Sequence, residues 1–188
     1  MAARQRLIGC ARSCQTWRPR RPVERDRREL TIRAVERFLQ AASEKGLSIE
    51  VRRFPEETRT AADAARAIGC GVDQIVKSLV LMADGEPFLA LTSGSNRADP
   101  RRLAELLRAA EVRRATPDEA RAATGFAIGG TPPFGHPGRL RVLMDADLTR
   151  HDVVWAAAGA PDAVFPIAPE ELLSATGAEI AEFKEDQA

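Results

Sequence analysis

From about residue 30 onward, the chain alternates between hydrophobic repeats of helical period and hydrophobic repeats of strand period. A repeat of three to four residues gives one buried face on a helix, and a repeat of two gives one buried face on a strand. Ser, Thr or Asp before a helical repeat, and Gly after it, mark the ends of the helix. These signals predict helices over 31–46, 60–69, 100–110, 117–124, 151–158 and 169–176. They predict strands over 47–54, 75–82, 86–92, 126–128, 140–148 and 163–167.

Two of the predicted strands are separated only by Asp84-Gly85. A type I′ turn needs positive φ at both of its central residues, and Asp-Gly is a preferred pair there, so this sequence predicts a β-hairpin. Helices and strands interleave elsewhere, but the hairpin and the irregular spacing argue against a regular doubly wound fold. The pattern predicts a single α/β domain with a mixed, partly antiparallel sheet.

Composition excludes several classes of protein. A hydrophobic fraction of 44% and a charged fraction of 29% over 188 residues are typical of a globular domain. No apolar run reaches the roughly 18 to 20 residues of a membrane helix, so we expect no membrane association. Three cysteines without a neighbouring histidine do not make a disulfide framework or a zinc site. We therefore expect reduced thiols in a cytoplasmic protein, with no metal and no cofactor.

The first 29 residues differ from the rest of the chain. They contain nine arginines against three acids, a net charge of +6, whereas the remainder carries −5. This arginine density, with Pro19 and Pro22 and little periodicity, predicts a disordered leader over 1–29 and a folded domain over 30–185. Three interpretations of the leader are open: a segment translated from a misplaced start codon, a solvated tail without a role, or an arm that touches RNA phosphates.

Lys77 is unusual by residue type and by place. The chain has 25 arginines and only three lysines, and Lys77 lies within an apolar strand, IVKSLVL. It is either a strand lysine that extends to solvent and blocks edge pairing, or an ammonium at the rim of a pocket. In the second case low dielectric makes it a strong point charge for a phosphate or a carbonyl oxygen.

The segment Gly129–Gly138, GGTPPFGHPG, is the second unusual feature. Its four glycines and three prolines fix an irregular backbone. It is either an ordinary connection between strands or a loop whose N–H groups stabilise an oxyanion. His136 closes the segment, either as a packing residue or as a group for proton transfer or a substrate hydrogen bond.

The order of these motifs resembles a known family. TAADAARAIG, then QIVKSLVL, a hairpin, ATGFAIGGTPPFGH and a strand ending in Asp145 are similar to the YbaK and prolyl-tRNA-synthetase-associated editing domains over about residues 31–183. The two signatures are a lysine in an I-V-K-S/T-L strand, met by Lys77, and a G-x-x-x-P loop, met by Gly129 to Pro133. The resemblance implies a mixed sheet curled toward a barrel with helices around it, and an aminoacyl-tRNA deacylase for tRNA-Pro or tRNA-Cys carrying a small wrong amino acid.

The same resemblance implies roles for individual residues. Lys77 is expected to position the 3′ end of the tRNA, and Gly129 and Gly130 to supply backbone donors. Further expected substrate contacts, some of them weaker candidates from position alone, are Pro133, Gly135, His136, Thr58, Ser93 and Asp145. Asp145 has an alternative role as the cap of the next turn.

No Ser-His-Asp or Cys-His-Asp arrangement is evident, because His136 and His151 are the only histidines. An aminoacyl ester is already activated, so positioning and oxyanion stabilisation are sufficient for its hydrolysis. The expected partners are the acceptor end of a mischarged tRNA and an aminoacyl-tRNA synthetase, while the oligomeric state is left open. The alternative is a non-catalytic module that uses the same pocket to bind a small ligand, which the acidic net charge of the body favours.

Overall fold

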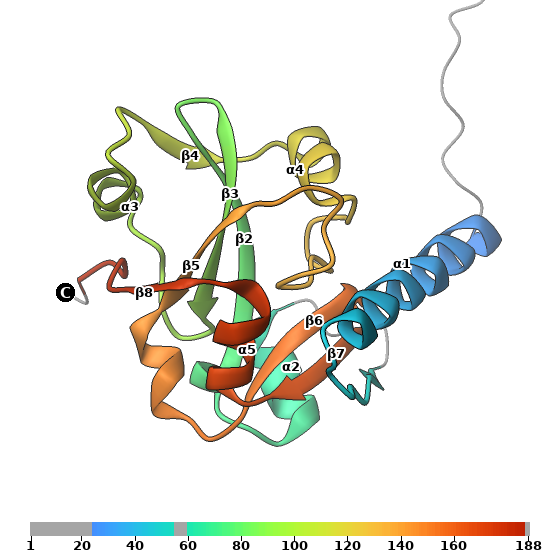
Figure 1. Ribbon diagram of the computed structural model, residues 1–188. Helices are drawn as coiled ribbons and strands as arrows, with labels where there is room; N and C mark the ends of the chain where they lie inside the picture. The colour runs from blue at the N-terminus through green and yellow to red at the C-terminus, as the bar shows by residue number, and fades with distance from the viewer. Residues whose placement is uncertain (1–23, 55–59, 187–188) are drawn as a thin grey trace, which may run out of the picture.

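The computed structural model describes the backbone of residues 24–54 and 60–186, and side chains from residue 29 onward (Figure 1). In this part of the chain the helices are α1 (Glu24–Glu44), α2 (Ala61–Ile68), η1 (Val72–Gln74), α3 (Pro100–Leu107), α4 (Pro117–Thr124), η2 (Ala146–Arg150) and α5 (Pro169–Thr176), of which η1 and η2 are 3-10 turns. The strands are β1 (Arg52–Arg53), β2 (Ile75–Ala83), β3 (Glu86–Ser93), β4 (Val112–Arg114), β5 (Arg141–Asp145), β6 (Val154–Ala160), β7 (Ala163–Ile167) and β8 (Glu179–Ala181).

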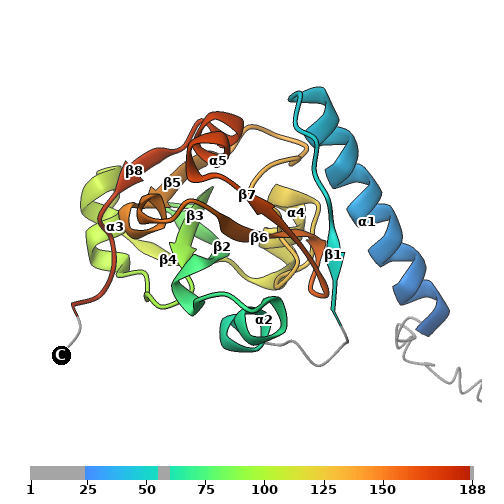
Figure 2. The same ribbon diagram turned by 90° about the horizontal axis from the view of Figure 1, so that it is seen from below.

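The described strands form one mixed sheet in the order β1-β7-β6-β2-β3-β5-β8, with β4 paired to the end of β2. The pairs β2–β3 and β6–β7 are antiparallel, whereas β2–β6, β3–β5 and β5–β8 are parallel. Both views show a twisted sheet with helices around it, α1 lying beside β6 and β7 and α3 on the opposite side (Figures 1 and 2). The predicted mixed α/β fold is confirmed.

Local signals predicted the best-defined turns correctly. The Thr60 hydroxyl accepts from the Asp63 N–H at 3.1 Å, and the Asp63 carboxylate accepts from the Thr60 N–H, which completes a capping box. The hairpin between β2 and β3 turns at Asp84 and Gly85, whose φ values of +49° and +89° are both positive, as a type I′ turn requires.

Other predictions were wrong. Residues 151–158, predicted as a helix, contain the start of β6, because its apolar run is buried on both faces and such a run has no period that separates strand from helix. No strand forms over 126–128, and of 47–54 only β1 pairs, at the edge of β7. Helix α1 begins at Glu24, so the boundary predicted after residue 29 falls inside it and Thr31 is not its cap. The rest of the predicted leader lies outside the described residues.

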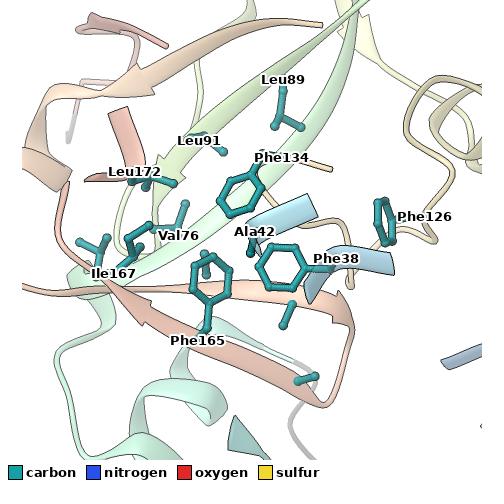
Figure 3. Close-up of a cluster of buried hydrophobic side chains, with 14 of the residues drawn as sticks. Phe38, Ala42, Val76, Leu89, Leu91, Phe126, Phe134, Phe165, Ile167 and Leu172 are labelled. Atoms are coloured by element: carbon teal, nitrogen blue, oxygen red, sulfur yellow. The ribbon is translucent and has the colours of Figure 1, made fainter. Parts of the chain in front are cut away.

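The main core lies on the face of the sheet that α1 covers. Phe38 of α1 is fully buried, with its ring centroid 4.8 Å from that of Phe165 and 5.1 Å from that of Phe134 (Figure 3). Val76 of β2 faces the same cluster. The second core, on the other face, contains Leu81. The Phe134 contact matters for the site, because this ring belongs to the glycine- and proline-rich loop.

Phe38→Ala should therefore destabilise both the sheet and the loop. Truncating a buried phenylalanine costs about 3 to 5 kcal/mol in the free energy of unfolding. Ile32→Ala on the same helix is the matched control, because Ile32 is 49% exposed and its truncation should change that free energy by about 0.5 kcal/mol or less. Urea unfolding measures both values, and equal losses would contradict the proposed burial of α1.

Candidate functional site

Lys77 lies on β2 opposite Thr92 of β3, on the face of the second core. Its half-buried Nζ donates to the backbone carbonyl of Gly94 at 3.3 Å and to that of Asn96. Burial lowers the pKa of the ammonium, Asp145 opposes this by favouring the charged form, and Arg114 and Arg97 lower the pKa further. An ammonium has three N–H donors, so the two carbonyls leave one donor for a further partner.

The turn after β3, residues 93–96, supplies both of these carbonyls. It is held to the start of β2 by the Gly94 N–H, which donates to the Ile75 carbonyl at 2.7 Å. The Ser93 hydroxyl donates to the Asp73 carbonyl at 2.9 Å. A Cβ on Gly94 would lie 2.1 Å from the Val72 carbonyl oxygen, so the turn approaches η1 more closely than any other residue permits.

Asp145 fixes the turn from the other side. Its carboxylate is 1% exposed, and one oxygen accepts from the Ser93 N–H at 3.1 Å and from the Asn96 side-chain amide at 2.9 Å. The other oxygen accepts from the Asp147 N–H at 3.1 Å and so caps η2. The capping role considered for Asp145 is therefore present, and a substrate contact by Asp145 or by the buried Ser93 stays a prediction.

The Gly129–Gly138 loop is anchored by close packing. The Gly130 N–H donates to the Ala127 carbonyl at 3.1 Å, and a Cβ on Gly130 would lie 2.7 Å from the backbone of Ala160 at the end of β6. Gly129 has a φ of +90°, which glycine adopts without strain. Pro133 is buried beside Phe134, whose ring packs in the main core.

The loop and Lys77 lie along one interruption in the sheet. On the side of β2 away from β3, the ladder to β6 ends at Val76 and the ladder to β4 begins at Leu81. The Val80 carbonyl accepts from the Ala115 N–H at 3.2 Å, just beyond β4, so among the described residues the stretch without a strand partner on that side is 77–79. Lys77 stands at one end of this interruption, and Figure 1 shows β6 diverging from β2 toward the loop, where Gly130 packs on it.

The structure thus brings the predicted residues together in two groups. Lys77, Ser93 and Asp145 share one hydrogen-bond network, which also contains Asn96 and two residues that the sequence did not single out, Asp147 and Lys184. The loop group contains Gly129, Gly130, Pro133, Gly135 and His136, and it packs on the opposite face of the sheet. Thr58 lies outside the described residues.

His136 stabilises the loop from within. Its Nε2 lies 2.9 Å from the Pro132 carbonyl, which only accepts, so the ring carries its proton on Nε2. Burial lowers the pKa of His136, the Pro132 carbonyl opposes this, and Arg37 lowers it further. The ring also lines a cavity of about 420 Å³ between the loop, α1 and α5.

Among the described residues, no three His, Cys, Asp or Glu side chains gather in a way that would hold a metal ion. None of the described helices is both long and apolar enough to cross a membrane.

Comparison with known proteins decides the family. The family model of the aminoacyl-tRNA editing domain matches residues 55–175. The chain belongs to this family. The proline–tRNA ligase of Nitratidesulfovibrio vulgaris strain DP4 is 36% identical over 96 residues, which cover 51% of this chain and 17% of the ligase, so the similarity extends over only a small part of that relative's length. YwhH of Bacillus subtilis strain 168 is 29% identical over 124 residues, which cover 65% of this chain and 78% of YwhH.

Solved structures agree with this membership. A structure described as a candidate trans-editing enzyme for prolyl-tRNA synthetase has a TM-score of 0.78 and 44% identity, covering 81% of this editing-domain chain and 98% of its own. The hypothetical protein APE2540 has a TM-score of 0.73 and 29% identity, covering 79% and 99%. The resemblance, and the curled mixed sheet that it implies, are confirmed.

The pKa of His136 predicts a pH dependence of stability. Because the folded-state pKa lies below the ordinary value of about 6.5, the unfolded state binds more protons in this window, and stability falls as pH falls through about 6.5 toward the folded-state pKa. His136→Gln should reduce the difference in unfolding free energy between about pH 7.5 and about pH 5.5. His151→Gln is the control, and an unchanged difference in His136→Gln would contradict the burial of this ring.

The close packing of Gly130 predicts that two glycines of the same loop differ in their tolerance of a side chain. Gly130→Ala forces a Cβ against the Ala160 backbone and should cost about 1 to 3 kcal/mol in the free energy of unfolding. Gly138→Ala is the matched control, since a Cβ there has open space within 4 Å. Urea unfolding of both variants checks the prediction. An unchanged free energy of unfolding in Gly130→Ala would contradict the close packing of the loop on β6.

Proposed function

We propose that this protein is a trans-acting aminoacyl-tRNA deacylase that hydrolyses the ester of a mischarged tRNA. The observation that carries the proposal is the half-buried Lys77 ammonium, which has one N–H donor beyond its two carbonyl partners and lies at the interruption of the sheet. The family match and the trans-editing description of a similar structure support it.

The chemistry asks little of the protein. Water adds to the ester carbonyl, the bond between this carbon and the ribose oxygen breaks, and the ribose oxygen takes the proton that water loses. The products are the free amino acid and the tRNA. The hydroxyl next to the ester in the ribose is available to orient the water, so the reaction needs no protein nucleophile.

The protein contributes positive charge and donors where negative charge collects. The free N–H of Lys77 contacts the terminal phosphate or the developing oxyanion, and partial burial strengthens this attraction relative to bulk water. The backbone N–H of Gly129 is the proposed second donor, and Gly130, whose N–H already donates to the Ala127 carbonyl, is proposed to fix the backbone of the loop that carries it. Pro133, Gly135 and His136 fix the loop shape around the aminoacyl group, and Thr58, Ser93 and Asp145 are proposed to support it.

Selectivity follows from size in this proposal. One methylene is worth only about 1 to 3 kcal/mol in binding, so a synthetase does not fully reject smaller amino acids, and a separate editing site is useful. We propose tRNA-Pro or tRNA-Cys carrying a small wrong amino acid as the substrate. The proline–tRNA ligases among the relatives favour tRNA-Pro, with a prolyl-tRNA synthetase as the proposed source of the mischarged substrate.

Lys77→Met should reduce kcat/KM for deacylation by about 100-fold or more, because it removes a charged donor and keeps the length of the side chain. Lys77→Arg should also lose most activity, since a planar guanidinium does not reproduce the tetrahedral donors of an ammonium. Arg33→Met is the control and should retain wild-type activity, because the Arg33 side chain on α1 is 70% exposed.

Release of amino acid from a panel of mischarged tRNA-Pro and tRNA-Cys measures these variants. Full activity in Lys77→Met would remove the role given to this lysine. If wild type hydrolyses none of the panel but binds the tRNAs or a free amino acid, the protein is a binding module instead.

A further inference from the structure

We propose that Asn96 is a positioning residue for the Lys77 ammonium and that Lys184, acting through Asp147, holds Asn96 in place. For its catalytic consequence this inference rests on the proposed function, because Lys77 is the group that is positioned. The geometric part stands on the contacts of the turn alone.

Asn96 is held through its side-chain amide nitrogen, its backbone N–H and its backbone carbonyl. Its side chain is buried, and the amide nitrogen donates one hydrogen to Asp145 at 2.9 Å and one to Asp147 at 2.8 Å. Its backbone N–H donates to the Ser93 carbonyl at 3.0 Å. Its backbone carbonyl is therefore held in one direction, and that carbonyl accepts from Lys77.

This arrangement decides where the remaining donor of Lys77 points. The N–H bonds of an ammonium are tetrahedral, so fixing two of them on the carbonyls of Gly94 and Asn96 fixes the third. A four-carbon side chain otherwise rotates freely and loses conformational entropy on binding a substrate. With a rigid acceptor at residue 96, the Lys77 side chain loses this conformational entropy when the protein folds. Lys77 is then already oriented when the substrate binds.

Two carboxylates beside one amide need a balancing charge. Lys184 Nζ lies 2.5 Å from the same Asp147 oxygen that accepts from Asn96. The pKa of Asp147 is lowered, first by Lys184 and then by Asn96, so its carboxylate stays charged and stays an acceptor. Arg150 also pairs with Asp147, at 3.1 Å from its other carboxylate oxygen, so without Lys184 the repulsion between Asp147 and the buried Asp145 would be only partly offset and the turn would loosen in part.

The C-terminal segment holds Lys184 at this point. The Asp99 N–H donates to the Phe183 carbonyl at 2.7 Å, and the Glu185 N–H donates to the Arg97 carbonyl at 2.8 Å. Their partners Arg97 and Asp99 follow the turn 93–96 directly in the sequence. Arg102 binds the same segment through Asp186 at 2.6 Å, but none of the contacts of this ion pair runs to Asn96.

The number of lysines allows a direct test in the full chain. Only Lys45, Lys77 and Lys184 are present, so NMR titration of labelled lysine side chains gives three resonances that single substitutions assign. In Asn96→Ala, loss of the rigid acceptor should expose the Lys77 ammonium and raise its pKa toward the ordinary value, because burial is the main cause that lowers it. The kcat for deacylation should fall by about 10-fold or more, with a smaller change in KM.

Lys184→Met should also raise the pKa of Lys77 and lower kcat, each by less than Asn96→Ala does. This variant guards against a folding defect in Asn96→Ala, because the Lys184 side chain is 38% exposed. Arg102→Met is the matched control and should leave the Lys77 titration and kcat unchanged.

If neither Asn96→Ala nor Lys184→Met alters the Lys77 titration, the positioning role is wrong, whatever the thermal stability of the two variants. If wild type has no deacylase activity but the titration shifts as expected, the proposed function fails while the geometric inference holds.

Discussion

The buried carboxylate of Asp145 is the interaction on which the geometry of the candidate site depends. It carries a charge at the end of β5, where it is 1% exposed, and it accepts hydrogen bonds from Ser93, Asn96 and Asp147. A buried charge is tolerated only when hydrogen bonds or an opposite charge compensate for its lost hydration. The turn after β3 must therefore close on Asp145, and the carbonyls that bind Lys77 follow from that closure.

Asp145 in turn compensates for the burial of the Lys77 ammonium. Lys77 is itself half-buried, and Asp145 favours its charged form while Arg114 and Arg97 oppose it. Moving either Lys77 or Asp145 would leave the other less well compensated. The two charges, on β2 and β5 with β3 between them, thus stabilise one arrangement of these three strands.

The interruption in the pairing of β2 lies beside Lys77, where we propose that the substrate reaches its ammonium. β2 passes from pairing with β6 to pairing with β4, and residues 77–79 lie between the two pairings. Unpaired strand edges are usually avoided, because they bind other strands. Here β6 diverges toward Ala160, and the close packing of Gly130 on that residue fixes the loop beside the divergence.

Sequence reasoning succeeded where a local signal has one physical meaning. The capping box of Thr60 and the Asp84-Gly85 turn require particular residue types, so both were predicted and both are present. It failed at β6, where burial on both faces removes the strand period and alanines fit a helix equally well. Lys77 and the loop were found by motif, because each is unusual in composition.

The partners of Lys77 were not predictable in the same way. Asn96 follows a strand and resembles any polar residue that ends one, while Lys184 lies 107 residues from Lys77 in a short C-terminal segment. Their roles depend on β3 and β5 lying side by side and on the Ala98–Lys184 bridge, and no local pattern encodes either pairing. Long-range pairing creates the site, so only the structure shows it.

The choice of lysine in an arginine-rich chain now has a physical reason. Two backbone carbonyls, of Gly94 and Asn96, converge on one nitrogen, and a tetrahedral ammonium satisfies both while keeping a third donor. A guanidinium spreads its charge over a plane, and its donors diverge from one another. With 25 arginines elsewhere, the chain favours arginine wherever a diffuse charge suffices. At position 77 the converging carbonyls require a point charge, and this requirement distinguishes Lys77 from an incidental charge on a strand.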